Sequence, residues 1–299
     1  MRRLVWIGVF AAAAQASLPG PVRANAALDS LVAGERAFAA ASRAKGIKES
    51  FLAFMAEGAI VFQPQAMDGR KFWDARPSSK AVLNWEPAFA CVSSDGDMGY
   101  TCGPWEFQPP PDSSGAPASP ERYLYGHFNS VWVKEKKTGW RVIADIGITH
   151  PRPTRGGVGS GEYTPGPNLP IRTMMSNRTK LEDLDKRLSK SMRSMPPREA
   201  LAAHAAQDLR LGSEGRMPTV GLEASQGQLD SLGGFFVFLP QASRVSRSND
   251  LGFTYGLAER YISAKGPPAD SSAYLNVWRL ENGKVWQLAL EVLKPLGSR

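Results

Sequence analysis

Two side chains that could act together as an acid and a base are His127 and Asp145. Both lie in a predicted β-hairpin over residues 122–148, where apolar and polar positions alternate. If Trp132 lies opposite Trp140, residue 127 lies opposite residue 145, and both side chains point to one face of the sheet. A histidine oriented by a carboxylate can serve as a general base or as a donor to a ligand. The plainer interpretation is a structural hydrogen bond between the two strands.

The two cysteines, Cys91 and Cys102, are a second chemically distinctive pair. They flank the turn at residues 94–97 and would face each other if the hairpin closes there. An oxidising compartment would then favour a disulfide, whereas a one-residue change of register would leave two separate buried thiols. Two cysteines without a nearby histidine do not make a tetrahedral ligand set. We therefore expect no metal site, and no motif in the chain predicts a cofactor.

The first 26 residues have the features of a secretory signal peptide. Arg2 and Arg3 precede a short apolar run, and residues 24–26 (Ala-Asn-Ala) offer the small side chains that a signal peptidase needs. The apolar run is too short to span a bilayer. We expect an exported bacterial protein, periplasmic or secreted, that begins at Ala27 after cleavage and has no membrane span.

The composition is that of an ordinary globular protein, and its excess charge is local. Hydrophobic residues make up 42% of the 299 residues and charged residues 21%. The net charge of +8 falls to +5 without the three arginines of residues 1–26, and residues 151–200 account for that +5. A nucleic-acid binder usually carries a basic face on a recognisable module. We interpret the basic block as a solvated connector and helix, and expect no nucleic-acid partner.

A repeated motif divides the chain into two similar parts. The pattern Asp-x-Gly-x-Thr-x-Gly occurs at residues 97–103 and again, 153 residues later, at 250–256. A second match relates residues 130–140 to residues 276–286 at an offset of 146. Nearly constant offsets over this length indicate a tandem duplication of a domain of about 120 residues rather than a short solenoid repeat.

Each part is predicted to begin with helices and to continue in antiparallel strands. Apolar spacing predicts helices at 28–45, 48–56, 179–194 and 197–206. Alternating patterns and turn residues predict strands at 59–62, 83–93, 98–108, 122–134, 140–148, 208–212, 232–245, 251–264, 272–280 and 284–294. Residues 149–178 are rich in proline and glycine and are predicted to be a linker. This leaves a first domain at 27–148 and a divergent second domain at 179–299, each an α+β cone.

Four segments carry a family resemblance: ERAF at 35–38, WEP at 85–87, GDMGYTCGPW at 96–105 and WRVIADIG at 140–147. Together they resemble the NTF2-like superfamily, and are most similar to its SnoaL-like and DUF4440-type bacterial members. The resemblance implies two cone-shaped domains, each with helices packed on a strongly curved antiparallel sheet and a pocket at the open end. Glu35, on the apolar face of the first predicted helix, would be either a partly buried acid in that pocket or an acid at the helix edge. Aromatic residues that could form its walls, or simply belong to the core, are Trp85, Tyr100, Trp105, Tyr125 and Trp132.

The resemblance does not decide the function, because the superfamily includes ketosteroid isomerases, polyketide cyclases, dehydratases and members that only bind or scaffold. The isomerases place an acid just after the first strand, where this chain has Phe62-Gln-Pro-Gln65. We therefore expect a protein that binds a small apolar or amphipathic molecule, or acts as a scaffold. The alternative is an isomerase, cyclase or dehydratase that uses His127 with Asp145. Two fused domains also predict a monomer with an intramolecular pseudo-dimer.

Overall fold

The structure is a computed structural model that describes residues 26–154, 158–159, 161–170 and 180–297. The predicted signal peptide, apart from its last residue, and part of the predicted linker lie outside the described residues. In the described part of the chain, no helix is both long enough and apolar enough to cross a membrane.

The first half of the chain forms three helices and an eight-stranded sheet. The helices are α1 (Ala26–Lys45), α2 (Ile47–Phe54) and α3 (Gly69–Asp74). The strands are β1 (Met55–Phe62), β2 (Ala66–Asp68), β3 (Val82–Trp85), β4 (Phe89–Val92), β5 (Met98–Gln108), β6 (Leu124–Glu135), β7 (Gly139–His150) and β8 (Thr164–Pro165). The sheet order is β2-β1-β7-β6-β5-β4-β8, and β3 also pairs with β5. A short 3₁₀ turn, Pro120–Arg122, precedes β6.

The second half repeats this plan with six strands. Its helices are α4 (Glu182–Ser194), α5 (Pro197–His204) and α6 (Leu222–Leu232). Its strands are β9 (Ala205–Ser213), β10 (Thr219–Val220), β11 (Phe235–Val245), β12 (Leu251–Tyr261), β13 (Asp270–Glu281) and β14 (Val285–Pro295), in the order β10-β9-β14-β13-β12-β11. In each half the first long strand pairs in parallel with the last, β1 with β7 and β9 with β14. The mixed α+β class and the two separate sheets are as predicted.

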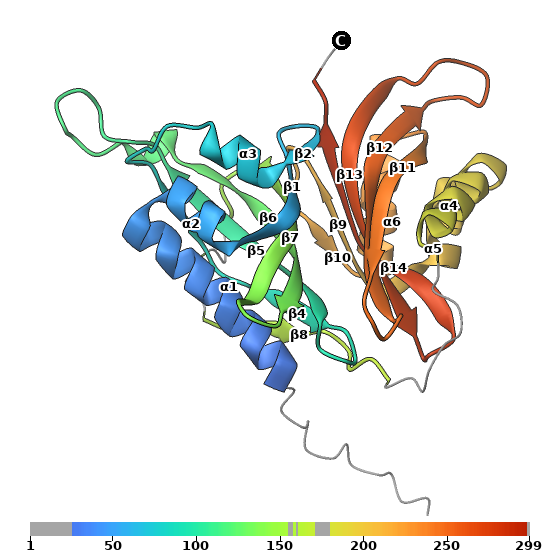
Figure 1. Ribbon diagram of the computed structural model, residues 1–299. Coiled ribbons are helices and arrows are strands. Elements are labelled where there is room, and N and C mark those ends of the chain that lie inside the picture. The colour runs from blue at the N-terminus through green and yellow to red at the C-terminus, as the bar shows by residue number, and fades with distance from the viewer. Residues whose placement is uncertain (1–25, 155–157, 160, 171–179, 298–299) are drawn as a thin grey trace, which may run out of the picture.

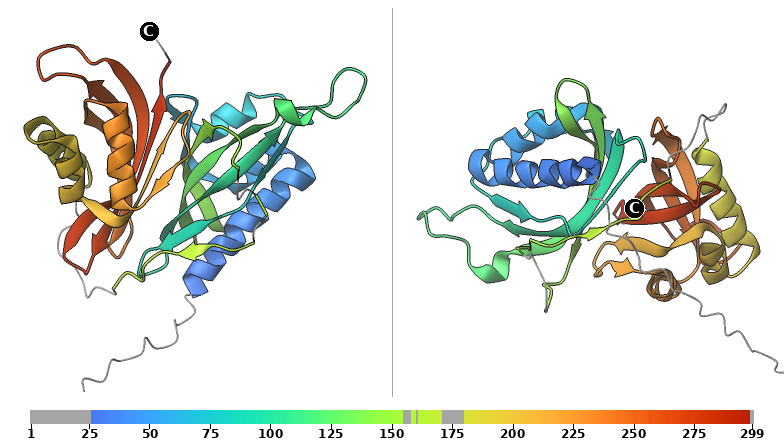
Figure 2. Two further views of the ribbon diagram at one scale, coloured as in Figure 1. Left: turned by 180° about the vertical axis from the view of Figure 1, so that it is seen from behind. Right: turned by 90° about the horizontal axis from the view of Figure 1, so that it is seen from below.

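The two sheets pack against each other, and the helices cover their outer faces (Figures 1 and 2). One apolar cluster combines residues of both sheets, among them Tyr100 and Ile148 of the first and Phe253 and Leu275 of the second. Separate clusters lie under the helices of each half. Because strand side chains alternate between faces, each sheet supplies one row of residues to its own helices and the other row to the neighbouring sheet.

The repeated aspartates make matching contacts between the halves. Asp97 accepts a hydrogen bond from the backbone N–H of Arg247, with O···N distances of 3.2 and 3.4 Å. Asp250 accepts one from the backbone N–H of Ser94 at 3.1 Å. Ser94 and Arg247 are separated by 153 residues, the same offset that relates Asp97 to Asp250. The two contacts are therefore equivalent, one made by each half to the other. This is the geometry of an isologous, two-fold interface within one chain.

The repeated glycines of the motif lie where the chain passes close to other atoms. A Cβ on Gly99 would lie 2.5 Å from a methyl carbon of Leu31 in α1, and a Cβ on Gly252 would lie 2.5 Å from one of Leu181 beside α4. A Cβ on Gly103 would lie 2.0 Å from a backbone oxygen. The motif therefore sets how closely each helix lies on its sheet.

Three expectations need correction or refinement. The predicted linker is not wholly irregular, because Thr164–Pro165 adds the short strand β8 beside β4. Helix α6 was not predicted, and it occupies residues left without an assignment. Of the two alternatives for the cysteines, the structure has the separate buried thiols: Cys91 lies opposite Tyr100 and Cys102 opposite Phe89. The hairpin register offsets the two cysteines by two residues, so they do not face each other.

Candidate functional site

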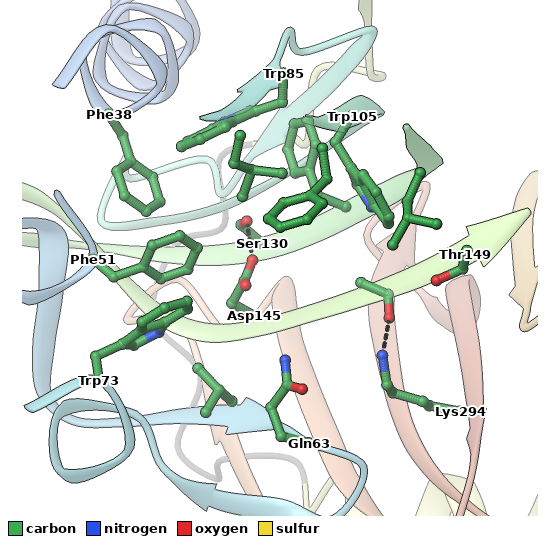
Figure 3. Close-up of a pocket in the computed structure, with 16 residues that line it drawn as sticks. Phe38, Phe51, Gln63, Trp73, Trp85, Trp105, Ser130, Asp145, Thr149 and Lys294 are labelled. Atoms are coloured by element: carbon green, nitrogen blue, oxygen red, sulfur yellow. Dashed lines mark hydrogen bonds between the residues drawn. The ribbon is translucent and has the colours of Figure 1, made fainter. Parts of the chain in front are cut away.

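A pocket of about 360 Å³ opens between the helices and the concave face of the first sheet (Figure 3). It is mainly aromatic and aliphatic, with a few polar groups. The apolar lining is Phe38, Phe51, Val61, Trp73, Leu83, Trp85, Trp105, Phe107, Leu124 and Phe128. The other lining residues are Gln63, Ser130, Asp145, Gly147, Thr149 and Lys294. The volume and the chemistry of this lining are those of a small-molecule site.

The aromatic wall is held by contacts among its own members. Phe38 of α1 packs edge-on against Phe51 of α2 and Trp85 of β3, each with ring centroids 4.8 Å apart. Phe51 in turn lies 4.3 Å, centroid to centroid, from Trp73 of α3. The helices therefore present a preformed apolar surface to the pocket, so little side-chain entropy would be lost when a ligand binds.

Asp145 is the carboxyl group of the pocket. It lies on β7 opposite Ser130 of β6, and the Ser130 hydroxyl donates to its Oδ1 at 2.7 Å. Burial raises the pKa of Asp145 to about 6, while the Ser130 hydrogen bond and the charge of Lys294 act in the opposite direction. A carboxyl whose pKa lies this close to neutrality can either accept or donate a proton to a bound molecule.

One buried polar atom among the lining residues has no partner. The indole Nε1 of Trp73 is enclosed and has no hydrogen-bond partner within the described chain. Buried donors are normally paired, with protein or with ordered water. The groups that the pocket offers to a ligand are the carboxyl of Asp145 and the polar side chains of Gln63, Ser130, Thr149 and Lys294.

The predicted pairing of His127 with Asp145 is wrong. The hairpin pairs Trp132 with Val142 instead of Trp140, and a further register shift between Val131 and Trp132 places His127 opposite Ile148, and Ser130 opposite Asp145. Since neighbouring strand residues face opposite ways, His127 points to the other side of the sheet from Asp145. It lines a separate hollow of about 120 Å³ between the two halves.

His127 instead contacts a second histidine. Its Nδ1 lies 2.8 Å from Nε2 of His150, whose own Nδ1 lies 2.8 Å from the Pro151 carbonyl oxygen. A carbonyl only accepts, so His150 donates from Nδ1 and accepts at Nε2, and His127 is the donor between the rings. Burial, together with His150 and the positive charge of Arg210, lowers the pKa of His127 to about 4. His127 is thus neutral at pH 7.

Glu35 is buried beneath the pocket wall rather than exposed within the pocket. Its Oε1 accepts from Trp85 Nε1 at 2.6 Å, and its Oε2 accepts from Thr101 Oγ1 at 2.6 Å and Trp132 Nε1 at 3.0 Å. Burial raises its pKa to about 7, and the three hydrogen bonds partly offset that rise. Glu35 therefore ties α1 to the sheet.

The second half has a matching arrangement. Asp185 of α4 accepts hydrogen bonds from Tyr274, Asn276 and Trp278. At the offset of 146 residues, Trp278 is the counterpart of Trp132. The counterpart of Asp145 is Glu291, which is fully buried and has no hydrogen-bond partner in the described chain. Burial, and then the charge of Asp185, raises the pKa of Glu291 to about 8.

The aromatic candidates fall into three groups. Trp85 and Trp105 line the pocket. Tyr100 and Trp132 are buried in the core, Tyr100 between the sheets and Trp132 under α1. Tyr125 lies on a different surface hollow, beside His150. Of the five, only Trp85 and Trp105 are therefore pocket residues. Tyr100 and Trp132 take the core role left open for them, and Tyr125 lies outside the pocket, because alternation along β5 and β6 or hydrogen bonding to Glu35 directs these side chains elsewhere.

The described architecture also settles the type of fold. Each half has helices on the concave side of a strongly bent, mainly antiparallel sheet, and a pocket lies on that side in the first half. This is the α+β architecture that the sequence predicts for each half. Within the described residues, no group of three or more His, Cys, Asp or Glu side chains is placed to hold a metal ion.

Comparison with known proteins gave structural neighbours only. No family model and no curated protein matches the chain. An NTF2-like protein from Cytophaga hutchinsonii is 17% identical, covering 39% of this chain and 95% of that one, with a TM-score of 0.31. A ketosteroid isomerase-like protein from Erwinia carotovora atroseptica is 18% identical, covering 39% and 94%, with a TM-score of 0.32. A cystatin-fold protein of unknown function from Nostoc punctiforme is 18% identical, covering 40% and 90%, with a TM-score of 0.33.

Several pocket residues were not predicted from the sequence. Trp73 lies on the short helix α3, Gln63 directly follows β1, and Lys294 comes from the other half of the chain. No local pattern distinguishes these residues from surface residues. Asp145 was predicted, but as a partner of the wrong side chain.

Proposed function

We propose that this protein binds a small, mainly apolar molecule in the pocket of its first half, with Asp145 holding a polar group of that molecule. The observation that carries the proposal is the combination of a preformed aromatic pocket with a single carboxyl group on its wall. An apolar body would displace water from the aromatic wall, and the few polar groups would fix its orientation.

The proposal is tested with a neutral fluorescent probe, N-phenyl-1-naphthylamine, and a variant that fills the pocket. A Cβ on Gly147 would meet its nearest heavy atom, Trp105 Nε1, at 3.6 Å, so a side chain fits there without a backbone clash. Gly147→Leu should abolish saturable probe binding. Gly227→Leu is the matched control, because Gly227 is exposed on α6 with no atom within 4 Å of a Cβ. Saturable binding that Gly147→Leu leaves unchanged would overturn the proposal.

A second candidate is acid–base catalysis by Asp145, of the isomerase, cyclase or dehydratase kind. It is favoured by the pKa of about 6, which suits a group that takes a proton from a substrate carbon and returns it.

The catalytic candidate is tested by deuterium uptake at the carbon next to the carbonyl of an enolisable cyclic ketone in D₂O. Enzyme-dependent uptake that is lost in Asp145→Asn and kept in His127→Ala would support it. If the ketone binds but takes up no deuterium, the catalytic candidate is refuted and the binding function is retained.

We also propose that the protein is exported and is a monomer. Export is supported by the signal-like composition of residues 1–26, and the test is the N-terminal sequence of protein recovered from the periplasm, expected to begin at Ala27. The monomer is supported by the shared core between the two sheets, which occupies the face that a dimer would use. Light scattering that shows a stable dimer would contradict it.

A further inference from the structure

Lys294 reaches the pocket of the first half from the second half. It lies near the end of β14, and its Nζ donates to the carbonyl oxygen of Gly147 on β7 at 2.6 Å. The side chain is half-buried and forms part of the pocket lining. The first sheet and its helices alone therefore do not complete the pocket.

The lining is divided into an apolar region and a polar end. Figure 3 shows Phe38, Phe51 and Trp73 on one side, and Thr149 and Lys294 together on the other. Asp145 and Ser130 lie between these two regions. A molecule that fills the pocket lengthwise would therefore place one end against aromatic rings and the other beside an ammonium group.

The charge of Lys294 is not matched by a direct partner. In the described residues it takes part in no ion pair, and its one hydrogen bond is to a neutral carbonyl. An ammonium has three donors, so two remain for other groups. The acids nearest this end are Asp145, whose pKa Lys294 lowers, and Glu214, whose Oε2 accepts from the backbone N–H of Thr149 at 3.2 Å.

We propose that the ligand of this pocket is an amphipathic anion, with its acidic group bound by Lys294 and its apolar body against the aromatic wall. This inference rests on the proposed binding function and specifies the class of ligand. A hydrogen bond between two charged groups is stronger than one between neutral groups, and a half-buried ammonium is less screened than an exposed one. The second half of the chain thereby determines what the first half binds.

The test compares two probes that share one apolar body. 1-Anilinonaphthalene-8-sulfonate carries an anionic group that N-phenyl-1-naphthylamine lacks, and both fluoresce on entering an apolar site. Wild-type protein should bind the sulfonate more tightly than the neutral probe. Lys294→Met, which keeps the length of the side chain, should weaken sulfonate binding about tenfold or more and leave the neutral probe within about twofold.

The variants separate a structural role of Lys294 from a binding role. Loss of the Gly147 hydrogen bond alone would weaken both probes equally, whereas loss of an anion contact changes their ratio. Lys294→Arg should keep the preference for the sulfonate. If Gly147→Leu blocks both probes but Lys294→Met leaves their affinity ratio unchanged, this inference fails and the binding function stands. If Gly147→Leu blocks neither probe, the proposed function fails as well.

Discussion

Replacing Asp145 by asparagine should raise the free energy of unfolding, relative to wild type, more at pH 8 than at pH 4. Burial raises the pKa of this carboxyl from 3.8 to about 6 in the folded state. The folded protein thus holds the proton more tightly than the unfolded chain, and stability falls as the pH rises through this range. The rise corresponds to about 3 kcal/mol. Because the side chain is only half-buried and water can enter the pocket, we expect about 1.5–3 kcal/mol.

Asparagine is a suitable replacement because its carbonyl can still accept the hydrogen bond from Ser130 while carrying no charge. The measurement is the free energy of unfolding of both proteins in urea at pH 4, 6 and 8, followed by tryptophan fluorescence. The quantity of interest is how the difference between variant and wild type changes with pH, since this cancels most of the titration of other groups.

A matched control is Asp112→Asn. Asp112 lies in an exposed loop, and hydrogen bonds from Ser114 lower its pKa, so its replacement should bring no gain in stability at pH 8. If Asp145→Asn and wild type differ by the same amount at every pH, Asp145 carries no buried charge. That result would contradict the raised pKa of Asp145 in the folded protein.

Three further results are expected. Glu35→Ala should lower the free energy of unfolding at pH 5 by about 1–3 kcal/mol, because it leaves the buried donors of Trp85, Thr101 and Trp132 without their acceptor. At this pH Glu35, whose pKa burial raises to about 7, holds its proton in the folded protein, so the substitution removes no buried charge. Urea unfolding measures the loss, and unchanged stability would contradict the network. Burial raises the pKa of the Cys91 and Cys102 thiols to about 12, so both should resist alkylation by iodoacetamide until the protein is denatured. Mass spectrometry measures the alkylation, and a protein mass lower by two hydrogens would instead show a disulfide. Gly126→Ala should prevent folding because its Cβ would lie 2.0 Å from the Ile148 carbonyl oxygen. Gly227→Ala in α6 should instead raise the free energy of unfolding by about 0.5–1 kcal/mol. Thermal melts of the two variants distinguish these outcomes.

The overall plan of each half could be predicted because it depends on local patterns. Apolar spacing located α1 and α4, and the turn residue Gly139, with a φ of +74°, correctly closed the β6–β7 hairpin. The helix α6 was missed because its centre contains Gly227 among serines and glutamines, a composition that favours loops. Its stability comes from contacts such as that of the buried Leu229, which no local pattern reveals.

The candidate site was harder to predict because it depends on register and on distant segments. A single irregularity next to Trp132 moved His127 to the other face of the sheet. The repeated motif identified Asp97 and Asp250 as equivalent residues, but not that each bonds the backbone of the other half. Lys294 enters the pocket only because the two sheets pack together. Contacts between distant segments leave no periodic signal in the sequence.

Because the two packed sheets belong to one chain, equivalent positions in the two halves can carry different side chains, which identical subunits could not. Lys294 on β14 corresponds, at the offset of 146, to Ile148 on β7. Each side chain points across to the other half, Lys294 toward Gly147 and Ile148 toward Gly212. In a dimer of identical chains, a substitution at this position would alter both sites at once. Here the first half receives a cation from the second, and the second half receives a hydrocarbon side chain from the first. A substitution that suits the ligand of the first half therefore leaves the second half unchanged.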